Sequence, residues 1–313
     1  MKVTSISIKL MLVFLLLLSG CSTNKEHKKS QEQSPTKQKT FTLNSSRIQV
    51  NQYATINYLD YVSGNTDAIE YNTIDTSKLG TYEVTYSLED TTTNSNQEAK
   101  TMIVDVVRTY ENGIFNPTDL TPETITNPES ITALVNKTHQ IPSGWVPNDL
   151  VEVAGSSQQL RKEAAEAFEA FYQAAKNQGI TCYIISGYRT NDAQALYWQR
   201  QVEIYGEEYA SLYSAYPGRS EHQLGLAIDI SNQLTGNRLT EQVANSDIGK
   251  FIVSDGYKYG FILRYPQDKI NITNYGYEPW HMRYVGKETA EKIHQSTLTF
   301  EEYIEMNSVK KTV

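Results

Sequence analysis

The stretch SEHQLGLAIDI, residues 220–230, decides how the C-terminal half of this 313-residue chain is interpreted. From Leu224 onward, leucine or isoleucine occupies every second position, which predicts a strand with one buried face between His222 and Asp229. Asp229 has the opposite parity to these apolar residues. A carboxylate flanked by isoleucines on such a strand is costly unless it is paired or binds a metal ion.

A second phrase, YEPWHMRYV at residues 277–285, also alternates and predicts a strand on which His281 supplies a third metal ligand. A lone histidine is more often structural, but two imidazoles and one carboxylate suit zinc and leave a fourth position for water. Glu278 lies three residues before His281, where it can act as a general base. Pro279 between them breaks the strand pairing, so that both side chains turn inward.

A helix is predicted at residues 160–178, where apolar side chains recur at intervals of three and four and mark a scaffold face. The strand-like run TCYIIS follows it and ends in the turn SGYRT at residues 186–190. Arg189 emerges at this turn, where a rigid scaffold presents functional side chains. An ion pair with Asp192 or with another carboxylate is the structural alternative for this arginine.

Together, the phrases SGYR, SxHxxGxAxD and ExWH resemble those of the zinc D,D- and L,D-carboxypeptidases of the VanY type, which trim the stem peptides of bacterial peptidoglycan. The resemblance runs from about residue 131 to about residue 300 and includes VNKTHQIPSGWVP. It implies an α+β zinc peptidase domain at residues 131–305 with a mainly antiparallel sheet. No residue departs from the family pattern at a ligand or at the base.

The resemblance also implies roles for individual residues. Glu278 would be the catalytic base, and Arg189 would stabilise the developing oxyanion or the substrate carboxylate. Three residues would bind the zinc ion: His222, Asp229 and His281. Two more would contact the substrate: Ser220 and Gln194.

The implied reaction is hydrolysis of the C-terminal peptide bond of a peptidoglycan stem peptide, with zinc as the cofactor. One alternative is an endopeptidase that cuts cross-bridges, and another is a non-catalytic wall-binding lipoprotein. Glu278 argues against the latter, since binding alone has no use for a general base beside the metal. The choice between D,D- and L,D-specificity stays open, because it depends on pocket shape around one stereocentre.

The N-terminus predicts export. The apolar run at residues 10–20 is too short to span a bilayer but has the length of a signal-peptide core, which makes residues 1–20 a signal peptide. LSGC at residues 18–21 resembles the bacterial lipoprotein signal, in which the cysteine is acylated. Cys21 is therefore expected to anchor the protein on the extracytoplasmic face of the cell membrane, although an ordinary signal peptide is an alternative.

Residues 21–40 are expected to form a disordered tether, because they lack aliphatic and aromatic side chains over most of their length. Short alternating runs at residues 41–107 predict a small antiparallel sandwich. The phrase at residues 74–96 resembles bacterial immunoglobulin-like repeats, which bind wall components or serve as rigid spacers. Residues 108–130, rich in Asn, Thr and Pro, predict a linker.

Composition excludes other classes of protein. The chain has 28 basic and 36 acidic residues, a net charge of -8, which disfavours nucleic acid as a partner. Its two cysteines, Cys21 and Cys182, exclude a disulfide framework and a cysteine-rich metal site. The chain is thus predicted to be a multidomain lipoprotein, with an all-β immunoglobulin-like domain followed by an α+β zinc peptidase.

Overall fold

The computed structural model describes residues 40–64, 69–88, 99–110, 113–153 and 155–309. The predicted signal peptide, Cys21 and nearly all of the predicted tether lie outside these residues. Within the described part of the chain, no helix is both long and apolar enough to cross a membrane.

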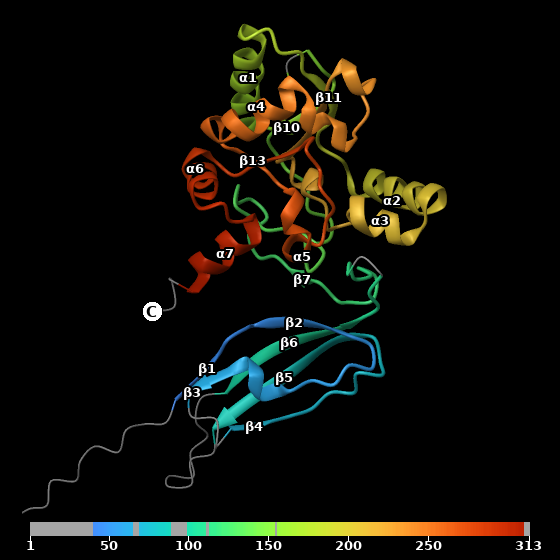
Figure 1. Ribbon diagram of the computed structural model, residues 1–313, viewed down its shortest axis with the longest axis vertical. Helices are drawn as coiled ribbons and strands as arrows, with labels where there is room; N and C mark the ends of the chain where they lie inside the picture. Colours follow the sequence, from blue (N-terminus) through green and yellow to red (C-terminus); the bar gives the residue numbers. More distant parts are fainter. Residues whose placement is uncertain (1–39, 65–68, 89–98, 111–112, 154, 310–313) are drawn as a thin grey trace, which may run out of the picture. The chain divides into compact units, whose positions relative to one another are not determined.

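A four-stranded antiparallel sheet forms the centre of the C-terminal half (Figure 1). Its strands, in spatial order, are β11 (Tyr183–Ser186), β12 (Ala227–Ser231), β14 (His281–Tyr284) and β13 (Phe261–Leu263). Asp229 on β12 pairs directly with His281 on β14, so the carboxylate and the imidazole start from facing positions. The predicted α+β fold with a mainly antiparallel sheet is confirmed.

Helices accompany this sheet and connect its strands (Figure 1). They are α1 (Lys162–Asn177), α2 (Asn191–Tyr205), α3 (Glu207–Tyr213), α4 (Asp247–Asp255), α5 (Ile270–Thr273), α6 (Lys287–Ser296) and α7 (Phe300–Val309). Two short strand pairs complete this half. They are β7 (Glu123–Thr124) with β8 (His139–Gln140), and β9 (Leu150–Glu152) with β10 (Gln159–Arg161).

Helix α1 is the scaffold that its apolar stripe predicts. The ring of Phe168 meets Phe261 of β13 edge to face, with 6.0 Å between centroids, and Phe171 meets Phe251 of α4 at 5.1 Å. The helix begins two residues later than predicted, because Leu160 belongs to β10 and pairs with β9. These contacts bury the helix against the sheet that carries the candidate site.

The N-terminal half of the described chain is all β. A four-stranded sheet has the order β2 (Arg47–Asn51), β6 (Lys100–Val107), β5 (Gly80–Leu88) and β4 (Ile69–Tyr71), and β1 (Phe41–Leu43) pairs with β3 (Val62–Gly64). Val84, Met102 and Val104 are fully buried in its core. β2 and β6 are parallel, unlike the predicted all-antiparallel arrangement. The immunoglobulin-like assignment stays a prediction.

Part of the segment predicted as a linker, residues 108–130, packs against the C-terminal half. Arg219 is only 6% exposed, and its guanidinium donates to the carbonyl oxygens of Pro117 and Leu120, and also to that of Lys137. Phe115 lies under the ammonium of Lys137, 5.5 Å from nitrogen to ring centroid. Residues 115–120 therefore provide hydrogen-bond acceptors and apolar cover to buried cations.

We expect a chain that begins at Ile131 to be less stable than one that begins at Arg108, by about 1–3 kcal/mol in unfolding free energy, because two acceptors of a buried guanidinium are lost. Urea denaturation measures the difference. Substituting Arg219→Met in both chains should reduce the difference in unfolding free energy, since the hydrogen bonds of the guanidinium are then absent from each. Equal unfolding free energies of the two unsubstituted chains would instead support the prediction that all of residues 108–130 form a linker.

Candidate metal centre and active site

His222 does not lie on the predicted continuous strand. Glu221–Leu224 form a 3-10 turn, and Gly225 follows in the left-handed region with φ 67°. A Cβ at Gly225 would also lie 2.9 Å from the Leu150 side chain, so only glycine fits there. The strand begins at Ala227, and both of its faces are buried, so the prediction of one strand with a single buried face is wrong.

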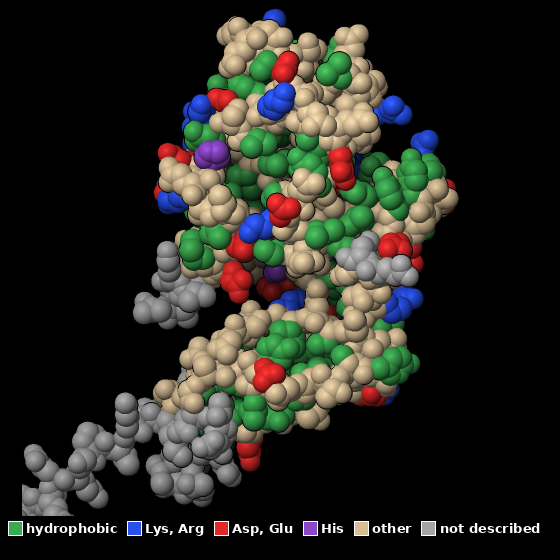
Figure 2. Space-filling view, in the orientation of Figure 1, with side chains coloured by type: hydrophobic (Ala, Val, Ile, Leu, Met, Phe, Trp, Pro, Cys, Tyr) green, Lys and Arg blue, Asp and Glu red, His purple; other side chains and the backbone are tan. Residues whose placement is uncertain are grey.

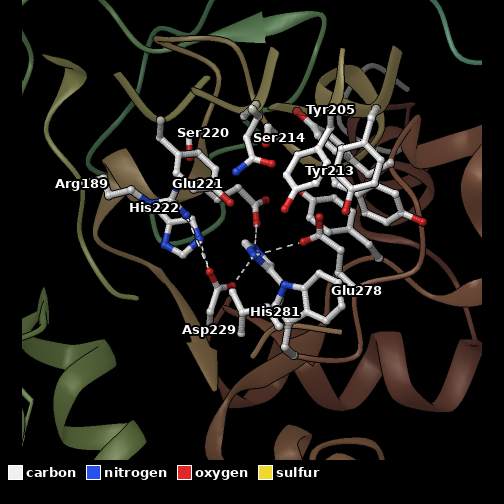
Figure 3. A pocket seen from close by; sticks show the side chains of 18 residues that line it. Arg189, Tyr205, Tyr213, Ser214, Ser220, Glu221, His222, Asp229, Glu278 and His281 are labelled. Atoms are coloured by element: carbon white, nitrogen blue, oxygen red, sulfur yellow. Dashed lines mark hydrogen bonds and ion pairs between the residues drawn. The ribbon is translucent and has the colours of Figure 1, made fainter. Parts of the chain in front are cut away.

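The turn and the two strands nevertheless bring the three predicted ligands together. One ligand atom from each of His222, Asp229 and His281 lies within 4.8 Å of the others, and all three residues are buried. His222 Nε2 is 3.2 Å from Asp229 Oδ2, and His281 Nδ1 is 3.0 Å from Asp229 Oδ1 (Figure 3).

Partners behind the two rings determine which nitrogen faces the centre of the cluster. His222 Nδ1 lies 2.7 Å from the Gly187 carbonyl oxygen, which can only accept, so Nδ1 holds a proton and Nε2 points to Asp229. His281 Nε2 lies 3.3 Å from Glu221 Oε2, which leaves Nδ1 toward Asp229. Such contacts orient histidine ligands in metal sites.

The electrostatics of the cluster favour a cation. Burial opposes ionisation of Asp229, but the contacts with His222 and His281 outweigh it and hold the Asp229 pKa well below its usual range. Burial likewise opposes a charge on His281, yet the adjacent carboxylates of Asp229 and Glu221 raise its pKa to about 9. Burial lowers the pKa of His222 to about 4.

The donor set fits a zinc ion. Asp229 Oδ1 is buried and has no hydrogen-bond donor in bonding geometry, although His281 Nδ1 is close by. An unsatisfied buried carboxylate oxygen is costly, and a cation shared with the two imidazole nitrogens would satisfy it. Two nitrogens and one carboxylate oxygen are the ligands of catalytic zinc sites.

Glu278 lies beside this cluster, as predicted. The His281 amide donates to the Glu278 carbonyl oxygen at 3.1 Å and closes a turn around Pro279, so both side chains point into the same cavity (Figure 3). Glu278 Oε2 is 3.7 Å from His281 Nδ1. Burial raises the pKa of this carboxyl group to about 8. A carboxyl group with a pKa near neutrality is suited to take up and release a proton.

Arg189 reaches the same cluster from the turn after β11. Its Nη2 is 3.7 Å from Asp229 Oδ2, and the guanidinium lies over the ring of Tyr197 at 4.8 Å. Its Nη1 donates to Gln194 Oε1 at 2.8 Å, and Gln194 Nε2 donates to the Ala215 carbonyl oxygen. Gln194 is fully buried, so the structure makes it a support for Arg189, which differs from the predicted direct contact with substrate.

A cavity of about 190 Å³ opens over these groups. Arg189 and Glu278 lie on opposite sides of it (Figure 3), and Ser220 also lines it. The predicted ligands, base, arginine and serine therefore share one cavity.

Glu221 is a functional residue that sequence analysis missed. Its side chain is fully buried, and one carboxylate oxygen accepts from Arg264 Nε at 2.7 Å and from Arg283 Nη1 at 2.8 Å. The other oxygen contacts His281 Nε2, and Arg264 is also held by two bonds to Glu301. The sequence did contain a signal for this role. Arg264 and Arg283 lie next to apolar strand residues, and a buried arginine requires a carboxylate partner.

We expect Glu221→Gln to lower zinc affinity about tenfold to a hundredfold, because His281 loses the anion that orients it. The same change should lower the unfolding free energy by about 3 kcal/mol, as two buried arginines lose a charged partner. Chelator competition and urea denaturation measure the two effects. Glu301→Gln is the control, because Glu301 binds Arg264 but does not contact His281. It should affect stability alone, and equal loss of zinc affinity in both variants would contradict the orienting role.

A buried His, Asp and His cluster with an adjacent carboxylate and an arginine across the cavity defines the active site of a metal-dependent hydrolase. Residues 157–287 match the family model described as VanY, D-alanyl-D-alanine carboxypeptidase. The putative carboxypeptidase YodJ of Bacillus subtilis (strain 168) is 46% identical over 197 residues, which cover 60% of this chain and 71% of that protein. The chain belongs to the VanY family of D-alanyl-D-alanine carboxypeptidases, as the sequence phrases predict.

Other relatives agree. The bifunctional D-Ala-D-Ala dipeptidase and carboxypeptidase VanXYC of Enterococcus gallinarum is 35% identical over 174 residues, covering 54% of this chain and 91% of that protein. Among solved structures, the LdcB LD-carboxypeptidase has 42% identity and a TM-score of 0.55, covering 64% of this chain and 92% of that one. VanYB in complex with D-alanine-D-alanine has 33% identity and a TM-score of 0.50, covering 56% and 97%.

Proposed function

We propose that this chain is a zinc-dependent carboxypeptidase that removes the C-terminal residue of peptidoglycan stem peptides. The observation that carries the proposal is the position of Glu278 next to the buried cluster, with Arg189 on the opposite side of the same cavity. The relative VanXYC, which has D-Ala-D-Ala carboxypeptidase in its name, and the structure of VanYB in complex with D-alanine-D-alanine support the substrate class.

Each residue has a chemical role in this reaction. His222, Asp229 and His281 would hold the zinc ion, which when bound polarises the scissile carbonyl group and makes a water molecule more acidic. Glu278 takes a proton from the attacking water and passes it to the leaving amine. The guanidinium of Arg189 binds the negative charge of the terminal carboxylate or of the developing oxyanion, and Gln194 holds it in place.

The test is incubation of the zinc-loaded chain with purified muropeptides that carry tetrapeptide or pentapeptide stems, followed by mass spectrometry. Loss of one terminal residue is the expected result. Trimming of pentapeptides indicates D,D-specificity, and trimming of tetrapeptides indicates L,D-specificity. Conversion of cross-linked dimers to monomers would support the endopeptidase alternative, and no product from any substrate would support a wall-binding protein.

We also propose that Cys21 is acylated and anchors the protein on the extracytoplasmic face of the cell membrane, with the immunoglobulin-like domain as a spacer. The support is the apolar run that ends in LSGC and the lysine-containing tether that follows it. Cys21→Ser should release the protein from membranes or leave it unprocessed, as seen by detergent partitioning and mass determination. Full membrane retention of a processed Cys21→Ser protein would contradict the anchor.

A further inference from the structure

Lys137 is a buried lysine that the proposed mechanism does not use, although it belongs to the phrase VNKTHQIPSGWVP. Lysine and arginine side chains stand out at the surface in Figure 2, whereas Lys137 is only 2% exposed. Among the described residues, its ammonium group donates to one carbonyl oxygen and lies over two aromatic rings, and it forms no ion pair. A buried ammonium group without a carboxylate is costly, so its place in the fold requires an explanation.

The ammonium group of Lys137 holds the C-terminal end of α3. It donates to the carbonyl oxygen of Ser211, and the Gly276 amide donates to the next carbonyl oxygen, that of Leu212, at 2.9 Å. The last four carbonyl groups of a helix have no partner within the helix, so these two bonds satisfy groups that α3 itself leaves unpaired. The same helix end is therefore joined both to Lys137 and to the segment that leads to Glu278.

The segment that leads to Glu278 packs tightly on this helix end. A Cβ at Gly276 would lie 2.5 Å from the Tyr213 ring, so the backbone comes as close to α3 as a glycine permits. Figure 3 shows Tyr213 and Glu278 on the same side of the cavity. Since Gly276 precedes Glu278 by only two residues, a shift of α3 against this segment also moves the base.

Lys137 also contacts this segment directly, through Tyr275. Its ammonium nitrogen is 4.8 Å from the centroid of the Tyr275 ring, and that ring packs on Tyr265 at 4.6 Å. A cation over an aromatic face is attracted to it, more strongly in a buried site. Burial holds the pKa of Lys137 well below its usual range, and the carboxylate of Glu278 opposes that shift. The lysine and the base are thus near enough to interact electrostatically.

We propose that Lys137 is a positioning residue for the catalytic base. By binding both the C-terminal end of α3 and the ring of Tyr275, it fixes the segment from Tyr275 to Glu278 against the helix. The carboxylate of Glu278 is thereby held toward the metal cluster. This inference rests on the proposed peptidase function, in which Glu278 is the base, and adds a residue that does not line the cavity.

The first test is Lys137→Met in the zinc-loaded full-length chain, because methionine is unbranched and apolar. The kcat for a stem peptide should fall about tenfold to a hundredfold, as expected for a displaced catalytic group, while KM changes by less than about twofold. Zinc content should not change, because the predicted ligands are other residues. Lys176→Met is the matched control and should retain full kcat, because Lys176 is an exposed lysine in the last turn of α1.

A double-mutant cycle shows whether Lys137 acts through Glu278. If it does, Lys137→Met should lower kcat little further once Glu278→Gln is present. Gly276→Ala leaves the lysine in place but displaces the segment from α3, so it should reproduce the loss of kcat. A loss in the double variant as large as the loss in Lys137→Met alone, or a loss confined to KM, overturns the proposal.

Hydrogen exchange followed by mass spectrometry separates this inference from the proposed function, since it needs no hydrolysis. In Lys137→Met, amide exchange at residues 274–280 should be faster than in the unsubstituted protein, while exchange in β12 stays the same. Faster exchange at these residues in a protein whose unsubstituted form hydrolyses no peptide would support the positioning role and reject the peptidase. Unchanged exchange there overturns the positioning role, whatever the activity.

Discussion

Glu278→Gln is expected to lower kcat by about 10²- to 10⁴-fold, the usual contribution of a general acid–base group, while zinc stays bound. Glutamine has nearly the same size but cannot accept a proton from water. The three predicted metal ligands are other residues, so metal content should be unchanged. The measurement is steady-state hydrolysis of a stem peptide together with elemental analysis of the same preparation.

Glu291→Gln is a suitable control, because this glutamate lies on α6 and contacts Gln295. It should retain full turnover. Near-normal turnover in Glu278→Gln would reduce Glu278 to a structural carboxylate, and the mechanism would then need another base. Loss of zinc in Glu278→Gln would instead show that its carboxylate is a ligand.

His222→Ala is expected to remove most of the bound zinc and to reduce hydrolysis to background. The unsubstituted protein should hold about one zinc ion per chain, since the described residues contain one such cluster and losing one of three ligands leaves too few for tight binding. His281→Ala should have the same effect, because both imidazoles face Asp229. Elemental analysis after gel filtration measures the metal content.

His294→Ala is the matched control. The imidazole of His294 stacks on Tyr257, with 3.9 Å between ring centroids, and is not part of the His222, Asp229 and His281 cluster. This variant should keep its zinc and its activity. Unchanged metal content in His222→Ala would falsify the ligand assignment and leave the buried cluster as an ion-pair network.

Local sequence pattern was sufficient to predict the ligands and the base. His281 and Glu278 are three residues apart with a proline between them, and Asp229 interrupts an apolar strand, so each stands out within a short window. The resemblance to the family motifs then indicated that these short segments belong to one site, and the match to the VanY family model and to YodJ confirms the family. Strands β12 and β14 of the central sheet were predictable in part for the same reason, because alternation indicates a strand although it did not give where β12 begins.

Other features depend on contacts that no local window contains. The alternating leucines after His222 have the spacing of a strand. The chain nevertheless turns there, because Gly225 adopts a left-handed conformation and lies close to Leu150. Gln194 was expected to touch substrate, and only the folded structure shows that it is fully buried, with bonds to Arg189 and to the Ala215 carbonyl oxygen.

By itself, the sequence determined the family and predicted the metal ligands, the base and the arginine, because each rests on residue types at short spacings. Only the tertiary structure decided the role of Glu221, whose partners Arg264 and Arg283 are 43 and 62 residues away. The packing of Pro117 over Arg219, 102 residues apart, was decided in the same way. A buried charge is stable only when the fold supplies its partner, and that partner is chosen by the folded chain in three dimensions.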